Sequence, residues 1–249
     1  MDLDLNGKRA IVTGGSVGIG KATARELANE GVDVVICARR QDVLEGAAQE
    51  LAAETGRKVV PIVADTNNTE SVNAMVEQAV SELGGLDILV NNAAAPGGLV
   101  LGPLPESDDG DLLSDINTKV VGYFRCAKAS APHMQAQGWG RIINIGGLAA
   151  RNAGTYSGLR NAALVHLTKT LSNQLGPDGI NVNLVHPGAT ITERTSEEAA
   201  SGPLGNDIRR MVDATEVAYV VTFLASPKSI SIAGEVVAAG GGAGSSVYQ

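Results

Sequence analysis

Short apolar runs alternate with longer amphipathic stretches along the whole of the 249-residue chain. The short runs are rich in Val and Ile and almost continuously apolar, which is typical of parallel strands covered by helices on both faces. This alternation predicts a single domain, residues 1–249, built on one doubly wound parallel α/β sheet of about seven strands with right-handed crossovers. We expect the strands at residues 9–14, 33–38, 58–65, 86–93, 141–146, 180–188 and 235–239.

The stretches between these runs repeat apolar residues every three or four positions, which predicts helices that pack one face on the sheet. Clear apolar stripes lie within residues 43–51 and 72–83. Ligands of such sheets bind beyond the carboxyl ends of the strands, so the candidate site is expected there. We expect the other helices at residues 19–31, 111–130, 155–175 and 215–225, the first of them ending at Gly31.

Charge and composition argue against several classes of function. The formal net charge of -8 disfavours nucleic acid as a partner. No run of 18 apolar residues predicts a membrane span, and the acidic N-terminus does not read as a signal peptide. Cys37 and Cys126 are too few for a disulfide framework and fit the reducing cytoplasm. His133, His166 and His186 do not have metal-ligand spacing, so we expect no metal site.

The segment TGGSVGIG, residues 13–20, ends the first expected strand and opens the first helix. Gly14 permits a tight turn, Gly18 lets the backbone approach a pyrophosphate, and Gly20 lets the helix pack close to the strand. The helix N-terminus then presents free N–H groups to the phosphates. The alternative is a glycine-rich turn without a ligand, and the position directly after the first strand disfavours it.

This glycine spacing resembles that of the short-chain dehydrogenase/reductase family, classical type, and the resemblance extends over nearly the full chain. Asp65 matches the acid that contacts adenine in that family, and residues 91–94 match its Asn-Asn-Ala-Gly turn with Ala in the last position. Asn117 matches the catalytic asparagine. Residues 187–192 match the Pro-Gly segment whose threonine, here Thr192, holds the nicotinamide carboxamide.

The resemblance implies a Rossmann-type, NAD(P)-dependent oxidoreductase that acts on a small carbonyl or alcohol. It also implies a homo-oligomer, a tetramer or a dimer, that pairs through helices at residues 111–130 and 155–175. The polar segment 189–214 corresponds to a substrate lid, although a solvated loop would look the same. The residues assigned to the cofactor are Gly14, Ser16, Val17, Gly18, Ile19, Gly20, Arg39, Arg40, Asp65, Thr66, Asn92, Ala93, Tyr156, Arg160, Pro187, Gly188, Thr190 and Thr192.

The end of the second strand favours NADP(H) over NAD(H). A carboxylate at this position accepts the ribose hydroxyls of NAD and repels the 2′-phosphate of NADP. Ala38 stands there instead, followed by Arg39 and Arg40, whose guanidinium groups suit a phosphate. Val17 fills a second position that is often basic in NADP-preferring relatives, so NAD(H) stays the weaker alternative. The alternative is a pair of solvated arginines at the start of a helix, and the missing carboxylate disfavours it.

The catalytic positions depart from the family pattern. In the family a serine orients the substrate carbonyl, a tyrosine transfers the proton, a lysine lowers the pKa of that tyrosine and holds the ribose, and an asparagine anchors a water. Tyr156 and Asn117 match two of these residues. The serine position falls on Gly147, and the lysine position falls on Arg160. The stretch from Gly147 to Tyr156 is also shorter than usual.

Each departure has a physical consequence. Arg160 keeps a positive charge one helical turn from Tyr156, so it would favour tyrosinate and donate to ribose, but it cannot release a proton at neutral pH. Gly147 removes a donor to the oxyanion, a loss that typically costs ~10²–10³ in rate. Asn152 and Thr155 are candidate replacements for the hydroxyl, although a turn residue and a helix N-cap explain them more simply.

Two hypotheses therefore stay open. The first is an NADP(H)-dependent oxidoreductase with an altered catalytic set, which the retained Tyr156 favours. The second is a catalytically silent NADP(H)-binding protein that serves as a sensor or partner subunit, which the double loss at 147 and 160 favours. A scaffold without a cofactor conflicts with the intact glycine loop.

Overall fold

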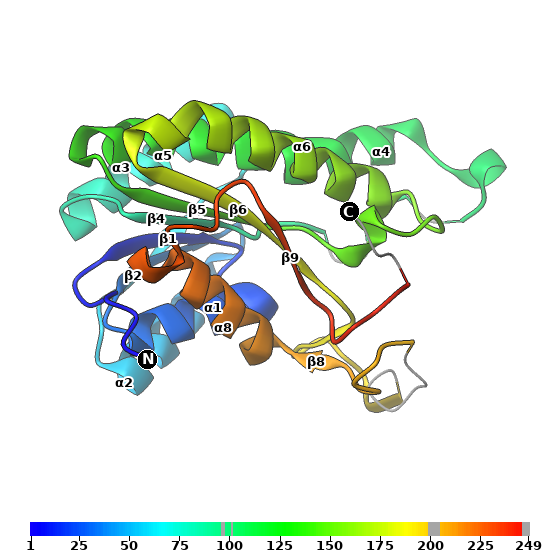
Figure 1. Ribbon diagram of the computed structural model, residues 1–249, viewed down its shortest axis with the longest axis horizontal. Helices are drawn as coiled ribbons and strands as arrows, with labels where there is room; N and C mark the ends of the chain where they lie inside the picture. Colours follow the sequence, from blue (N-terminus) through cyan, green and yellow to red (C-terminus); the bar gives the residue numbers. More distant parts are fainter. Residues whose placement is uncertain (96–97, 101, 199–204, 246–249) are drawn as a thin grey trace.

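The computed structural model describes residues 1–95, 98–100, 102–198 and 205–245 (Figure 1). Within these residues seven parallel strands form one sheet in the order β3-β2-β1-β4-β5-β6-β9, which confirms the predicted doubly wound sheet. The strands are β1 Arg9–Thr13, β2 Asp33–Ala38, β3 Val59–Val63, β4 Ile88–Asn91, β5 Gly140–Ile145, β6 Ile180–Pro187 and β9 Val236–Ala239. A short separate pair joins β7 Thr190–Ile191 to β8 Val212–Asp213.

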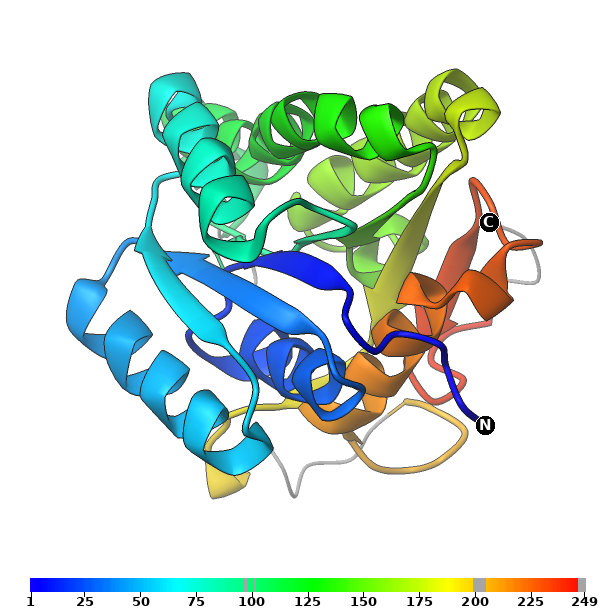
Figure 2. The ribbon, with the colours of Figure 1, turned by 90° about the vertical axis from the view of Figure 1, so that its left-hand side faces the viewer.

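Helices cover both faces of the sheet (Figures 1 and 2). One face carries α3 Thr69–Leu83, α5 Gly122–Gln137 and α6 Ser157–Leu175, and α4 Asp109–Ile116 continues this layer beyond the sheet. The other face carries α1 Gly18–Asn29, α2 Gln41–Thr55 and α8 Ala214–Ala225. The chain crosses from one half of the sheet to the other after β3, so that β1 and β4 lie side by side where the strand order reverses. Ligands of such sheets bind at the carboxyl ends of the two strands at this point.

The strand sequences explain the two layers. Successive side chains of a strand point to opposite faces. On β1, Ala10 and Val12 join the apolar cluster that includes Leu27 of α1. Ile11, between them, joins the cluster that includes Met75 of α3. Both faces of the sheet are buried under helices, which explains why the strand sequences are almost continuously apolar.

The amphipathic stripes become the buried faces of the helices. On α3 the stripe from Val72 to Ala79 is buried against the sheet. The helix begins at the Asn68 cap, whose side chain accepts from the Ser71 N–H at 2.7 Å, and it ends at Gly84 in the left-handed region. Cap, stripe and terminal glycine all agree with the sequence pattern.

The long helix expected at residues 111–130 is interrupted. A π-helical segment, η2 Asn117–Val121, lies between α4 and α5. Such wide turns inside helices occur often at functional sites, because they shift which side chains face inward. Close packing accompanies the interruption, since a Cβ at Gly122 would lie 3.2 Å from the Thr66 carbonyl oxygen.

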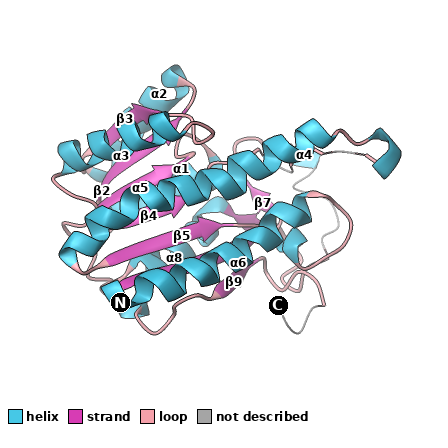
Figure 3. Ribbon diagram, turned by 90° about the horizontal axis from the view of Figure 1, so that it is seen from above, coloured by secondary structure: helices cyan, strands magenta, loops and turns pink. Residues whose placement is uncertain are grey.

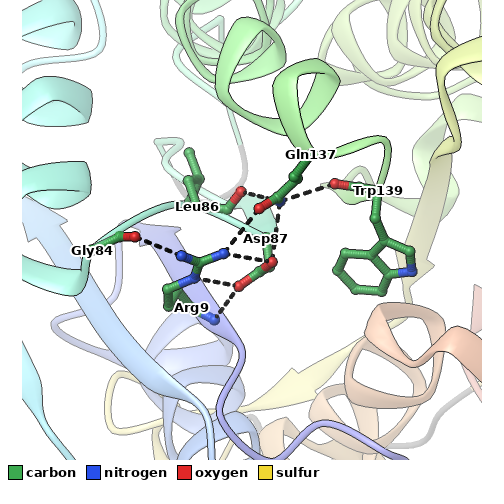
Figure 4. A network of polar contacts seen from close by, with 6 residues as sticks. All are labelled: Arg9, Gly84, Leu86, Asp87, Gln137 and Trp139. Atoms are coloured by element: carbon green, nitrogen blue, oxygen red, sulfur yellow. Dashed lines mark hydrogen bonds and ion pairs between the residues drawn. The ribbon is translucent and has the colours of Figure 1, made fainter.

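A polar network fixes the amino ends of the central strands (Figure 4). The Arg9 Nε donates to Asp87 Oδ2 at 2.6 Å, and Nη1 donates to the Gly84 carbonyl oxygen at 2.6 Å. Gln137, at the end of α5, donates to Asp87 Oδ1 at 3.1 Å. The hydrogen bond with Asp87 raises the pKa of Arg9. This network holds β1, β4 and α5 together on the side of the sheet away from the cavity described below.

No helix within the described residues is long and apolar enough to cross a membrane.

Candidate functional site

A cavity of about 1150 Å³ lies beyond the carboxyl ends of the strands, and residues of the loops that follow β1 to β6 line it. α4 and the β7–β8 pair extend at the same edge of the sheet (Figure 3). Of the residues that the sequence assigns to the cofactor, all but Gly20 and Tyr156 line this cavity. The order of the strands therefore brings together residues that are far apart in the sequence.

The glycine loop forms one end of the cavity. Gly14 and Gly18 have φ values of +65° and +60°, a region that favours glycine. A Cβ at Gly20 would collide with the Gly14 carbonyl oxygen, so only glycine allows this contact between helix and turn. The Asn92 side chain donates to the carbonyl oxygens of Thr13 and Gly14, both at 3.1 Å, and thereby fixes the loop.

A carboxylate already binds the N-terminus of α1. Glu193 Oε2 accepts a hydrogen bond from the Gly18 N–H at 2.8 Å. A helix N-terminus attracts negative charge through its free N–H groups and its dipole. The contact therefore identifies an anion site at the place where the sequence expects the pyrophosphate, and the donors and close glycines fit a dinucleotide.

The end of β2 supplies the positive charge. Arg39 and Arg40 are exposed side chains that line the cavity after Ala38. Within the described residues neither arginine forms an ion pair. Asp65, at the end of β3, instead accepts from the Asn67 backbone and side chain at 3.0 and 3.1 Å. Its carboxylate thus fixes its own loop.

Asn117 points to that loop rather than to α6. Its side chain donates to Asn67 Oδ1 at 3.1 Å and accepts from Arg125 Nη2 at 2.9 Å. Asn117 is not among the described residues that line the cavity, whereas Thr118 and Lys119 are. The structure thus places the side chain of Asn117, the match to the family's catalytic asparagine, in this polar cluster, while Lys119 of the same π-helical segment lines the cavity.

At the start of α6 the residues that line the cavity differ by one position from those that the family spacing indicates, since Ser157 lines it and Tyr156 does not. Tyr156 precedes the helix, is half-buried and is not among the described lining residues. Ser157, Arg160 and Asn161 are buried and line the cavity. They are spaced by three and four residues, so they share one face of the helix. The pair separated by one helical turn on the cavity wall is thus Ser157 and Asn161.

Arg160 is engaged in a buried ion pair. Its Nη1 binds Asp115 Oδ1 of α4, and its Nη2 donates to the Ala95 carbonyl oxygen at 3.0 Å. The two side chains are only 5% and 2% exposed. The guanidinium is therefore neutralised and oriented by Asp115, and it does not stand free to favour a tyrosinate as the sequence predicted.

Lys119 brings a second cation to the same region. The residue is 5% exposed, and its Nζ donates to the Gly146 carbonyl oxygen at 2.8 Å. Burial and, to a lesser extent, the charge of Arg160 lower the pKa of Lys119 to about 7, although the Asp115 carboxylate partly opposes both effects. An amine with such a pKa can both carry and release a proton near neutrality.

Gly147 lies between Asn161 and His186. Its N–H donates to His186 Nδ1 at 2.9 Å, so the His186 ring accepts at Nδ1 and carries its proton on Nε2. Burial lowers the pKa of His186 to about 4, with Arg151 and Lys119 adding to the effect, so the ring is neutral. A Cβ at Gly147 would lie 2.9 Å from Asn161 Nδ2. The Asn161 side chain therefore occupies the space that a residue larger than glycine at position 147 would need.

The predicted lid at residues 189–214 is described in part, because residues 199–204 lie outside the described residues. Its two ends are held together by the parallel pairing of β7 with β8. Thr190 and Thr192 line the cavity, and Thr192 accepts from the Arg194 N–H at 3.3 Å. No group of three or more potential metal ligands occurs within the described part of the chain.

Comparison with known proteins decides the family. The sequence model described as short chain dehydrogenase matches residues 8–201. The chain belongs to the short-chain dehydrogenase family. The prediction of an oxidoreductase of the short-chain type is therefore confirmed at the level of the family.

Two curated members of the short-chain dehydrogenase family match over nearly their whole length. A probable galactose dehydrogenase of Rhizobium meliloti is 34% identical, with 96% of each chain covered. A 3-oxoacyl-acyl-carrier-protein reductase of Vibrio cholerae is also 34% identical, covering 96% of this chain and 98% of the relative.

Two solved structures, a short-chain dehydrogenase and an L-sorbose reductase, also match over nearly the whole chain. One from Burkholderia cenocepacia, in complex with NADP, has a TM-score of 0.86 and 33% identity, and covers 96% of this chain and 98% of its own. An L-sorbose reductase from Gluconobacter frateurii, complexed with NADPH and L-sorbose, has a TM-score of 0.90 and 30% identity, covering 97% and 98%.

Within this short-chain dehydrogenase, sequence reasoning missed four residues on or beside the cavity. Asp115 and Lys119 are buried charged residues, but they lie in a polar stretch, residues 109–119, where nothing in the sequence distinguishes them from exposed charges. Ser157 and Asn161 were hidden by the one-residue shift in register. The cavity is thus lined by the amine of Lys119 from η2 and the amide of Asn161 from α6. The family resemblance instead assigned an amide, Asn117, to the segment before α5 and a cation, Arg160, to α6.

Proposed function

We propose that this chain is an NADP(H)-dependent oxidoreductase that moves a hydride between the nicotinamide and a small carbonyl/alcohol substrate, with an altered catalytic set. The observation that carries the proposal is one continuous cavity, which extends from the glycine loop at Gly14 and Gly18 to Lys119 and Gly147. A dinucleotide needs an anion site at one end and a reactive site at the other, and the Gly18 N–H group and the buried Lys119 amine support these two roles.

The choice of NADP(H) rests on the end of β2. Ala38 offers no carboxylate to ribose hydroxyls, and Arg39 and Arg40 line the cavity without competing ion pairs among the described residues. Structural neighbours crystallised with NADP or NADPH support the same choice.

Each part of the cavity then has a distinct task. The reduced nicotinamide, when bound, supplies the hydride. The N–H groups at the start of α1 bind phosphate, and the loop from Pro187 to Thr192 lines the cavity where the resemblance expects the nicotinamide. Because Gly147 has no side-chain hydroxyl, other donors in the cavity must stabilise the developing oxyanion of the substrate.

The second candidate function is a silent NADP(H)-binding protein that acts as a sensor or partner subunit. Three observations favour it: Gly147 has no hydroxyl, Arg160 is engaged by Asp115, and Tyr156 is not among the lining residues. The buried, unpaired cysteines Cys37 and Cys126 support a cytoplasmic setting for either function.

A titration and a turnover assay separate these functions. NADPH and NADH are titrated into the full chain by calorimetry, and NADPH consumption is followed with a panel of ketones, aldehydes and imines. Tight NADPH binding with turnover supports the oxidoreductase. Tight binding without turnover on any compound supports the silent protein. Absence of binding to either cofactor contradicts both.

A further inference from the structure

Lys119 is a buried amine whose hydrogen-bond donors are not all used. Within the described residues its Nζ makes a single hydrogen bond, to the Gly146 carbonyl oxygen at 2.8 Å, and forms no ion pair. An ammonium group carries three donors, so two remain free for a ligand. Lys119 lines the cavity together with Ser157 and Gly147, the position that the resemblance assigns to the serine that orients the substrate carbonyl.

The charged and titratable groups around Lys119 come from four elements. Arg160 of α6 and Asp115 of α4 form the buried ion pair, and their opposite charges largely offset each other at the amine. His186 of β6 is neutral and is hydrogen-bonded to the Gly147 N–H. Tyr123 of α5 donates to the Ile145 carbonyl oxygen at 3.1 Å, and burial raises the pKa of its hydroxyl. None of these neighbours holds the Lys119 ammonium permanently charged.

The other cavity residues are poor proton carriers at neutral pH. The Arg160 guanidinium does not deprotonate. The Ser157 hydroxyl is paired with the Thr155 hydroxyl at 2.7 Å, and a serine hydroxyl is far too weak an acid to exchange its proton near neutrality without a base. Asn161 has only an amide, and Tyr156 is not among the described lining residues. Lys119 is thus the cavity residue suited to exchange a proton with the substrate.

We propose that Lys119 is the general acid–base of this protein, a role that rests on the proposed oxidoreductase function. In reduction, hydride adds to the carbonyl carbon, the C=O π electrons move to oxygen, and the Lys119 ammonium gives that oxygen a proton, leaving a neutral amine and an alcohol. In oxidation, the neutral amine takes the hydroxyl proton while hydride leaves the carbon for the oxidised cofactor. Solvent then restores the starting protonation state of the amine through the open cavity.

The proposal fixes a pH dependence with a definite sign. Reduction needs the ammonium form, so kcat/KM for reduction falls as the pH rises through about 7. Oxidation needs the amine form, so kcat/KM for oxidation rises through the same range. If the two pH profiles have opposite slopes and the same midpoint, a single titratable group serves both reduction and oxidation.

Four variants of the full chain test the proposal in turnover. Lys119→Met removes the proton carrier, and Lys119→Arg keeps the charge but cannot release a proton, so both should lower kcat by ~10²–10⁴ while NADPH affinity changes little. Lys58→Met makes the same change at an exposed lysine that precedes β3 and does not line the cavity, and it should leave kcat unchanged. Tyr156→Phe should also leave most of the turnover intact.

A second measurement needs no turnover. Trace acetylation of the protein without cofactor, read at Lys119 by mass spectrometry across pH, reports when the amine loses its proton. Lys119 should reach half of its full reactivity near pH 7, whereas an ordinary exposed lysine does so near pH ~10.4. The exposed Lys58 is the internal reference.

The outcomes are distinct. Full turnover in Lys119→Met, loss of turnover in Tyr156→Phe, or a Lys119 profile that coincides with that of Lys58 would overturn the role of Lys119 and leave the proposed function standing. A wild-type chain that binds NADPH but reduces no carbonyl overturns the role as well. Failure to bind NADPH overturns the proposed function itself, whatever the acetylation profile.

Discussion

Arg160 of α6 and Asp115 of α4 form an ion pair between two nearly fully buried side chains, and this pair links the helix that ends before η2 to the helix that forms the cavity wall. Burying two charges costs solvation energy, and only their mutual attraction and added hydrogen bonds offset that cost. Removing one partner therefore leaves an uncompensated charge in a low-dielectric interior.

We expect Asp115→Ala to lower the free energy of unfolding by about 3–5 kcal/mol. Arg160→Met combined with Asp115→Leu removes both charges and should recover much of that loss, since replacement of a buried pair by apolar residues is often close to neutral. Urea unfolding of the wild type, the single variant and the double variant measures this. Equal stability of the single variant and the wild type would show that the pair is exposed in solution.

Asp115 should also control the proton affinity of Lys119. Its carboxylate raises the pKa of Lys119 against burial and against Arg160. In Asp115→Asn the opposing charge is gone, so the pKa of Lys119 should fall below about 7, and the acetylation midpoint of Lys119 should move to lower pH. An unmoved midpoint in a folded Asp115→Asn protein would show that the carboxylate does not act on the amine.

Glu193 should weaken cofactor binding. Its carboxylate occupies the Gly18 N–H at 2.8 Å, where a phosphate would have to displace it, and its charge repels phosphates. We expect Glu193→Gln to tighten NADPH binding several-fold, with the gain shrinking at high salt. Calorimetry at two ionic strengths measures both effects. Glu198→Gln, which removes an exposed charge from the same segment, is the matched control and should change the affinity little.

The fold was predictable from sequence because the signals are local and repeated. Apolar runs, stripes such as that of α3, and the glycine turn at Gly14 each specify their own element, and the right-handed crossover rule then orders the strands. The loops that line the cavity follow from this order. These parts of the structure need no knowledge of how distant side chains pair.

The catalytic wall was harder to predict, because it depends on helix register and on the wide turn at η2. Tyr156 and Arg160 matched the family spacing, but α6 begins at Ser157 and turns Ser157 and Asn161 to the cavity. The π-helical turn likewise directs Lys119, not Asn117, toward Gly146. Neither shift has a local sequence signal as strong as a glycine or proline, so both had to come from packing.

Arg39 should discriminate between the two cofactors. Its exposed guanidinium lines the cavity beside Ala38, where a 2′-phosphate would lie. We expect Arg39→Ala to weaken NADPH binding by ~10–100-fold, the typical value of a hydrogen-bonded charge pair, and to leave NADH binding nearly unchanged. Ala38→Asp should reverse the preference by restoring the carboxylate. Equal losses for both cofactors in Arg39→Ala would mean that the arginine acts on a part that they share.

We expect a homo-oligomer, a tetramer or a dimer, that pairs through α5 and α6. Exposed apolar side chains lie on this layer: Leu113 of α4 is 67% exposed, Phe124 of α5 is 46% exposed, and Leu159 of α6 is 53% exposed. Such side chains suit an interface between copies of the chain. Light scattering at micromolar concentration should show the assembly, and Phe124→Glu with Leu159→Glu should dissociate it. A wild-type monomer would contradict the expectation.

Gly147→Ser should restore an oxyanion donor only if Asn161 is also shortened. The backbone at Gly147 is extended, so a serine can adopt it, but its Cβ would lie 2.9 Å from Asn161 Nδ2. Gly147→Ser alone should therefore lower stability by about 1–3 kcal/mol, as overpacking of a buried contact does. Asn161→Ala removes this steric conflict, since the atoms that would contact a Cβ at position 147 belong to the Asn161 amide group.

The double variant should then raise kcat on simple ketones, by up to the ~10²–10³ that one oxyanion donor contributes. Asn161→Ala alone is the matched control, because it opens the same space without adding a hydroxyl. A rise in kcat in that control as large as in the double variant would show that space, and not the hydroxyl, limits the reaction.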